Sequence, residues 1–269
     1  MSVFVKPPAR VPFPSGLFSV IDFGNETHFP QGIEWEGIVS AQVSGISSYF
    51  EACAASAAPS GLPKVFDNTN DTGEANSFTV YGSYLCSPVG YTIEHASEMA
   101  EQALEIREQS RVEQALWTGD LGNVPNFSDA ASNGAAVSMA EAIADAEKFI
   151  QDHFGSVGVI HIPRAEVVYF LNEGLVRVDK ETGRIYTALG TPVVAGAGYP
   201  NASPITGAAG HWLVATGTLV GQRSEVFIGS STRGDLLDRG KNDLYGIAER
   251  TYSIGYDDET ALAVNFTVS

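Results

Sequence analysis

The sequence has few cysteines and few basic residues for its length. Its 269 residues include two cysteines, Cys53 and Cys86, and 15 Lys and Arg against 32 Asp and Glu, which gives a formal net charge of −17. Two cysteines cannot build a disulfide framework, and their spacing matches no zinc motif, so we expect two buried free thiols. The shortage of Lys and Arg argues against a protein that binds nucleic acid through its phosphates, because that binding needs clustered basic residues.

The sequence also lacks any apolar run near the roughly 18 residues that a membrane-spanning helix needs. Its first 16 residues contain four prolines, Pro7, Pro8, Pro12 and Pro14, which prevent them from forming the apolar helix of a signal peptide. We therefore expect no membrane contact, and a protein made inside the cell with its thiols reduced.

Aromatic residues are plentiful. Three Trp, ten Tyr and fourteen Phe can furnish a packed interior, which excludes a disordered acidic tail. Charged residues make up 17% of the chain, against a usual share of about 25%. Much of the surface is therefore expected to be neutral, as in a subunit that lies against others.

Two segments carry clear helix signals. The first runs from Thr92, a plausible N-cap, to about Thr118, and the second from Ser138 to about His153. Ser138 and the glutamate three residues later form a capping box. Along the first helix, one side is lined by glutamates, which we interpret as a solvated face and not as a metal site: Glu94, Glu98, Glu101, Glu105 and Glu108.

The other segments are mostly β-rich. Strands are predicted at 32–43, at 77–91 and at 156–162, followed by a short helix from Pro163 to Gly174. We predict a hairpin at 176–190, a strand at 191–199, and further strands across the last third of the chain. The mixed order, without repeating βαβ units, favours an α+β fold.

The sequence contains few motifs that indicate catalysis, metal binding or cofactor binding. The five histidines, at positions 28, 95, 153, 161 and 211, show no metal-ligand spacing. The glycines at 196 and 198 lack the third glycine of a dinucleotide loop, so we interpret them as a turn. The best enzyme hypothesis is a hydrolase with Cys53 or Cys86 as nucleophile and His161 or His211 as base. We favour a buried thiol for Cys86 and assign no catalytic, metal-ligating or cofactor-binding residue and no cofactor.

Five segments in the same order carry a resemblance to a known family. They are YGSYLCSPVGYTIEHASEMAEQALEIREQSRVEQALWTGD, FGSVGVIHIPRAEVVYF, TALGTPVVAGAGYP, WLVATGTLVGQRSEVF and NDLYGIAERTYSIGYDD. Together they resemble the major capsid proteins of tailed bacteriophages, particularly those infecting actinobacteria, which adopt the HK-ninety-seven (Johnson) fold. The resemblance covers roughly residues 80 to 268.

The resemblance implies a division of the chain. Residues 1–31 would be an N-terminal arm, and residues 32–91 an extended loop with adjoining strands of a peripheral domain. Residues 92–137 would hold that domain's spine helix, residues 138–220 the axial domain around the five-fold and six-fold axes, and residues 221–269 the return strands of the peripheral domain. The phenylalanines of the arm need cover, either from a neighbouring subunit or from their own domain.

The resemblance also implies a function. The chain would be a structural protein, not an enzyme, that self-assembles as pentamers and hexamers into an icosahedral capsid around double-stranded DNA, which it encloses without specific binding. Its place would be the virion, assembled in the host cytoplasm, with a separate scaffold protein, a portal and possible decoration proteins as partners. An encapsulin-type nanocompartment is the alternative within the same fold. Lys64 is the one lysine placed for a covalent link between subunits, but no Asn partner is identified for it, and we predict no crosslink.

Overall fold

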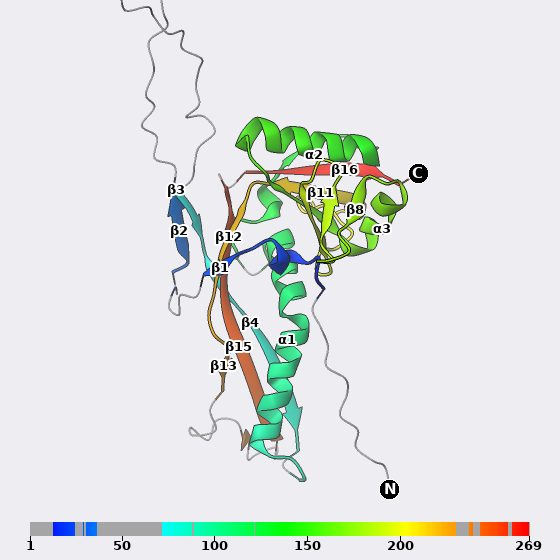
Figure 1. The fold of residues 1–269 in the computed structure, drawn as a ribbon. Helices are drawn as coiled ribbons and strands as arrows, with labels where there is room; N and C mark the ends of the chain where they lie inside the picture. The colour runs from blue at the N-terminus through cyan, green and yellow to red at the C-terminus, as the bar shows by residue number, and fades with distance from the viewer. Residues whose placement is uncertain are drawn as a thin grey trace, which may run out of the picture.

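Within the residues that it describes, the computed structural model has a six-stranded sheet, an eight-stranded sheet, a two-stranded sheet and three α-helices. It describes residues 13–24, 29, 31–36, 72–87, 89–120, 122–229, 237–238, 243–257 and 260–268. In Figure 1 a long helix and a long pair of strands form an extended lower part, and the second sheet with the other two helices forms the upper part. This arrangement confirms the predicted α+β class.

The first sheet has six strands and is built around its longest one. Strand β15 (Asp243–Tyr256) pairs with β4 (Ser77–Cys86) along one edge. Its other edge pairs in turn with β12 (Leu219–Arg223), β13 (Phe227–Ile228) and β14 (Leu237–Asp238), and β1 (Phe23–Gly24) extends the sheet beyond β12.

Helix α1 (Ile93–Thr118) packs along one face of β4 and β15. Two glycines allow the close approach: a Cβ on Gly246 would lie 1.9 Å from the carbonyl oxygen of Ala96, and one on Gly82 would lie 2.4 Å from that of Ala100. The predicted N-cap is confirmed, because the Thr92 side chain accepts from the backbone N–H of the third residue of the helix at 3.2 Å. Small residues thus fix how tightly the long helix lies on its sheet.

The second sheet has eight strands. Its main path runs through β5 (Ala131–Ser132), β16 (Ala261–Thr267), β11 (His211–Thr216), β7 (Val159–Pro163), β10 (Pro192–Gly196), β9 (Ile185–Thr187) and β8 (Val176–Val178), and β6 (Val137–Ser138) pairs with β16. A separate hairpin-like pair joins β2 (Ile33–Glu36) to β3 (Thr72–Ala75).

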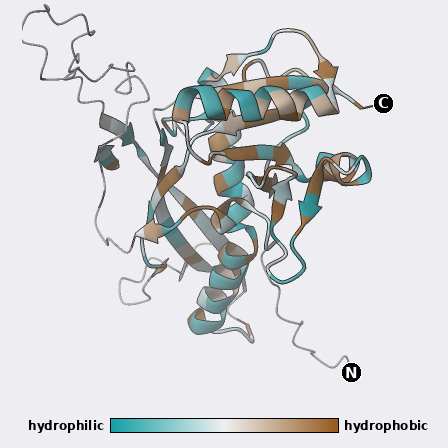
Figure 2. Cartoon of the chain, turned by 45° about the horizontal axis from the view of Figure 1, so that its top comes forward, coloured by the Kyte–Doolittle hydropathy of each residue, from teal (hydrophilic) through white to brown (hydrophobic). Residues whose placement is uncertain are grey.

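Helix α2 (Met139–Phe154) packs on β11 and β16 of this sheet. Figure 2 shows hydrophobic strands beneath it. The predicted capping box is confirmed, with reciprocal bonds between Ser138 and Glu141, and the helix ends at Gly155 in the left-handed region. The predicted short helix is α3 (Arg164–Asn172), and β8 and β9 form the predicted antiparallel hairpin.

Two buried clusters correspond to the two sheets. One lies mainly between α1 and the six-stranded sheet and contains Trp117, Phe127, Tyr252 and Tyr256. The other lies between the eight-stranded sheet and helices α2 and α3. The last strand, β16, pairs with β11 along six residues, so the segment 221–269 contributes to both sheets and not only to the six-stranded one.

The beginning of the predicted arm lies outside the described residues, but residues 13–24 pack on their own chain. They include the short 3-10 helix η1 (Leu17–Ser19), and Phe18 and Phe23 lie against Tyr252 at ring-centroid distances of 5.7 and 6.1 Å. For this part of the arm, cover comes from the subunit itself. Most of the predicted extended loop, with Cys53 and Lys64, also lies outside the described residues, as does His28.

Candidate assembly surfaces

The structure does not bring Cys86 together with the histidines of the hydrolase hypothesis, and Cys53 lies outside the described residues. Cys86 is half-buried at the end of β4 in the six-stranded sheet, opposite Leu244. His161 and His211 lie on β7 and β11 of the eight-stranded sheet. No hydrogen bond that the described residues form joins Cys86 to either histidine, so this pairing has no geometric support.

His161 is a core histidine with a defined tautomer. The Thr216 hydroxyl donates to the carbonyl oxygen of Gly217, so its oxygen accepts from Nε2–H of His161 at 3.1 Å. Nδ1 then accepts from the hydroxyl of Tyr199 at 2.9 Å. Burial lowers the pKa of His161 to about 3. The imidazole is therefore neutral and structural, and no base is exposed there.

His211 is bound to a buried acid. Its Nδ1 lies 2.9 Å from Oε1 of Glu166, whose side chain is buried. Burial raises the pKa of Glu166, and the hydrogen bond from His211 opposes that rise. The pair ties α3 to β11, with the His211 side chain still partly exposed to solvent.

Two other expectations concern metals and membranes. Among the described residues no group of three or more His, Cys, Asp or Glu side chains is arranged to hold a metal ion. In the same part of the chain, no helix has both the length and the apolar character that crossing a bilayer requires.

Glu113 is the one acid of α1 that is fully buried, among the described residues of that helix. Its Oε1 accepts from the backbone N–H of Leu17 at 2.9 Å, and its Oε2 accepts from that of Gly198 at 2.8 Å. Burial raises its pKa, and these hydrogen bonds act in the opposite direction. One carboxylate thus holds the N-terminal segment and the glycine-rich turn against the long helix.

The glycine-rich turn has a packing role. A Cβ on Gly198 would lie 1.8 Å from the carbonyl oxygen of Ser110 in α1. The turn therefore needs glycine in order to approach the helix, which agrees with its interpretation as a turn and not as a dinucleotide loop.

The predicted solvated face of α1 needs a correction at Glu108. Both of its carboxylate oxygens accept from Nη1 of Arg250, at 3.1 and 2.9 Å, and the Tyr252 hydroxyl donates to Oε2 at 2.8 Å. Burial raises the pKa of Tyr252, and the adjacent carboxylate adds to the rise. No local pattern could predict this link, because the partners of Glu108 lie more than 140 positions away in the sequence.

The face of the six-stranded sheet opposite α1 carries exposed apolar side chains. Tyr81, Glu249 and Phe227 are paired in one row across β4, β15 and β13. Tyr81 is 66% exposed and Phe227 is 60% exposed. A second exposed apolar group lies at α3 and β8 and consists of Val168, Tyr169, Leu171 and Val178.

No family model and no curated protein matches the sequence. Solved structures do match over nearly the whole chain. A chain from Microbacterium phage Oxtober96 is 12% identical with a TM-score of 0.57, covering 99% of this chain and 95% of that one. The capsid of the native GTA particle, computed with C5 symmetry, is 11% identical with a TM-score of 0.55, covering 99% and 94%.

A third match, from Mycobacterium phage Che8, is 13% identical with a TM-score of 0.50 and covers 98% of this chain and 94% of that one. The identities are low, but the coverage is nearly complete in both directions. The chain therefore has the phage capsid fold, which confirms the fold that the resemblance implied.

Proposed function

We propose that this chain is a major capsid subunit, a structural protein that assembles with copies of itself into an icosahedral shell. The observation that carries the proposal is the end-to-end likeness to a chain of the GTA capsid, which covers 99% of this chain and 94% of that one. Both chains therefore use nearly their whole length for the same fold. The uncovered apolar side chains on the six-stranded sheet and on α3 support contacts with further subunits.

The two sheets also support the implied division into domains. In this proposal the six-stranded sheet with α1 is the peripheral domain. The eight-stranded sheet with α2 and α3 is the axial domain, whose exposed apolar group at α3 and β8 faces the symmetry axis. Strand β16 belongs to the axial domain because it pairs with β11.

Electron microscopy of the purified protein tests the function. We expect closed shells built of pentamers and hexamers, with the subunit in the virion and double-stranded DNA inside when shells are recovered from infected cells. Shells that enclose a protein cargo and no DNA would favour the nanocompartment. Small particles of uniform size that never close into shells would contradict both forms of the proposal.

The net charge predicts how assembly responds to salt. Subunits with a charge of −17 repel one another as they approach, and mobile ions screen that repulsion over about 8 Å at physiological ionic strength. We expect added salt or magnesium to accelerate assembly, measured by light scattering. An acidic lining would also let DNA slide during packaging, because confinement needs no adhesion. Slower assembly with added magnesium and salt would contradict this electrostatic account.

A further inference from the structure

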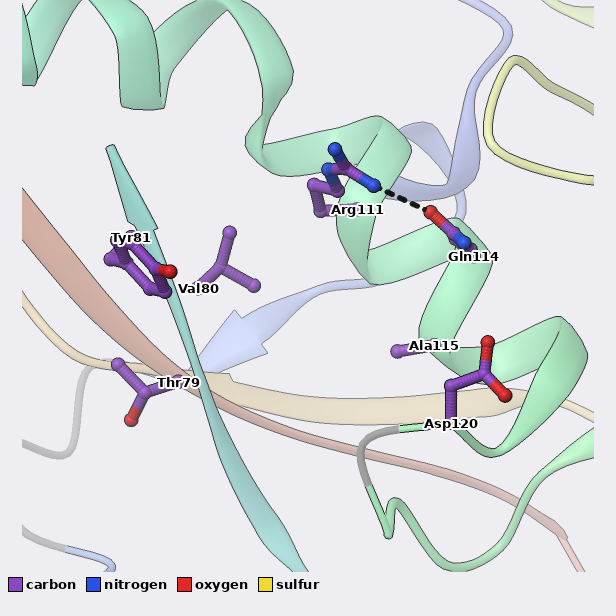
Figure 3. Close-up of a pocket in the computed structure, with 7 residues that line it drawn as sticks. All are labelled: Thr79, Val80, Tyr81, Arg111, Gln114, Ala115 and Asp120. Carbon is purple, nitrogen blue, oxygen red and sulfur yellow. Dashed lines mark hydrogen bonds between the residues drawn. The ribbon is translucent and has the colours of Figure 1, made fainter. Parts of the chain in front are cut away.

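A groove of about 390 Å³ lies between β4 and helix α1 and is lined by residues 79–81 of the strand and by Arg111, Gln114, Ala115 and Asp120. In Figure 3 the Arg111 guanidinium donates to Oε1 of Gln114 at 2.8 Å, and Asp120 lies apart from both. The side chains that line this groove form no nucleophile–base pair, so the groove supports no catalytic step. A group that reacts without a catalyst lies instead beside the eight-stranded sheet.

The pairing of strand β16 has a gap along one edge, which the side chain of Asn133 fills. β5 pairs with β16 at 262–263, and β6 pairs with it again at 266–267. Between these two places, Oδ1 of Asn133 accepts from the backbone N–H of Asn265 at 3.0 Å, and Nδ2 donates to the carbonyl oxygen of Asn265 at 3.5 Å. One side-chain amide thus takes the place of a strand residue and satisfies a backbone donor and acceptor of β16.

The backbone turns sharply directly after Asn133. The N–H of Ala135 donates to the carbonyl oxygen of Asn133 at 3.2 Å, and Gly134 between them has a φ of 82°. This is a γ-turn of the form that needs positive φ at its centre, which glycine adopts freely. The N–H of Gly134 donates to Oγ of Ser132 at 3.1 Å. Hydrogen bonds therefore hold both the side-chain amide of Asn133 and the backbone nitrogen that follows it.

Asn133 and Gly134 form the one Asn-Gly dipeptide in the sequence. Asparagine is chemically labile, because the backbone nitrogen of the next residue can attack its side-chain carbonyl carbon, and glycine offers the least steric hindrance to that attack. A bond forms between N of Gly134 and Cγ of Asn133, the Cγ–Nδ2 bond breaks, and ammonia leaves with the proton of the Gly134 nitrogen. Water then opens the resulting succinimide ring to aspartate or isoaspartate.

We propose that Asn133 is a site of spontaneous deamidation, which the native fold suppresses and unfolding exposes. In the folded subunit the Asn133 side chain must leave Asn265, and the N–H of Gly134 must leave Ser132, before the reacting atoms can meet. An unfolded chain has neither restraint.

The product of the reaction cannot restore the contact with β16. A carboxylate has no N–H to donate to the carbonyl oxygen of Asn265, and it places a negative charge against that oxygen. A subunit that reacts while unfolded therefore loses the link between β5 and β6, directly before helix α2 begins at Met139. The reaction marks such subunits permanently, and this inference does not depend on the proposed assembly function.

Peptide mass spectrometry of the full-length subunit provides the first test. Native samples and samples unfolded in guanidinium chloride are kept at the same pH and temperature, and deamidation of the peptide that contains Asn133 is followed over time. We expect the native rate to be at least about tenfold lower, because two hydrogen-bonded groups must first open and each opening contributes a factor of several. Asn126, which precedes Phe127, is the internal control and should react slowly in both samples. Equal rates at Asn133, or no reaction in the unfolded chain, would overturn the proposal.

Urea denaturation of Asn133→Asp provides the second test, because this variant carries the product of the reaction from the start. We expect its folding equilibrium constant to be about tenfold lower than that of the wild type, the effect of one lost hydrogen bond and one unpaired carbonyl group. The matched control is Asn201→Asp, an exposed position in a loop, which should keep the wild-type value. Equal stability of the two variants would show that deamidation does not damage the sheet, and the proposal would fail.

Discussion

Replacing Glu113 with alanine is expected to lower the free energy of unfolding of the subunit by roughly 3–5 kcal/mol. The carboxylate is fully buried and binds two backbone N–H groups, those of Leu17 and Gly198, at 2.9 and 2.8 Å. Alanine leaves both donors buried without acceptors and also leaves a cavity between three segments of the chain. Urea denaturation of the purified subunit measures the change.

Glu113→Gln is the sharper form of the same experiment. A protonated Glu113 still accepts at both oxygens, whereas the amide nitrogen of glutamine donates and would face one of the two N–H groups. We expect a loss of roughly 1–3 kcal/mol. The matched control is Glu105→Gln, an exposed position on the same helix, for which the change should stay within about 0.5 kcal/mol. Equal stability of the two variants would show that the carboxylate does not hold these segments.

The elements that local sequence signals determine could be predicted. Thr92 and Ser138 bind N–H groups three residues away, so their capping roles are visible in a short window of sequence. Strand β7 is buried at every position and appears in the sequence as a short continuous apolar run. The hairpin of β8 and β9 likewise depends on neighbouring residues.

Contacts between distant segments could not be predicted in this way. Glu113 looks like another acid of a polar helix, because its partners lie 96 and 85 positions away. The same holds for Glu108, which the glutamate pattern placed on a solvated face. The position of β4 within its sheet depends on which strands pair, and the alternation of its residues reveals only which side chains are buried. The overall fold could be predicted from the five segments that resemble a known family in the same order. No single motif among them was sufficient.

Lowering the pH from 6.5 to 5 is expected to reduce the stability of the subunit by about 2 kcal/mol through His161 alone. Burial lowers the pKa of this imidazole to about 3 in the folded state, whereas a histidine in an unfolded chain titrates near 6.5. Below pH 6.5 the unfolded state therefore binds one more proton than the folded state. The stabilisation is complete above pH 6.5 and declines by about 1.4 kcal/mol per pH unit until the pH approaches 3.

Urea denaturation at several pH values, compared between the wild type and His161→Gln, isolates this contribution. Glutamine can still donate to Thr216, so the variant should fold with reduced stability at pH 7 and lose the extra slope between pH 6.5 and 5. His153→Gln, at an exposed histidine near the end of α2, should keep the wild-type slope. NMR of the wild type gives a reading independent of any variant: the His161 ring should remain the neutral Nε2–H tautomer down to pH 5. A ring that titrates near pH 6.5 would show that Tyr199 and Thr216 do not enclose it as described.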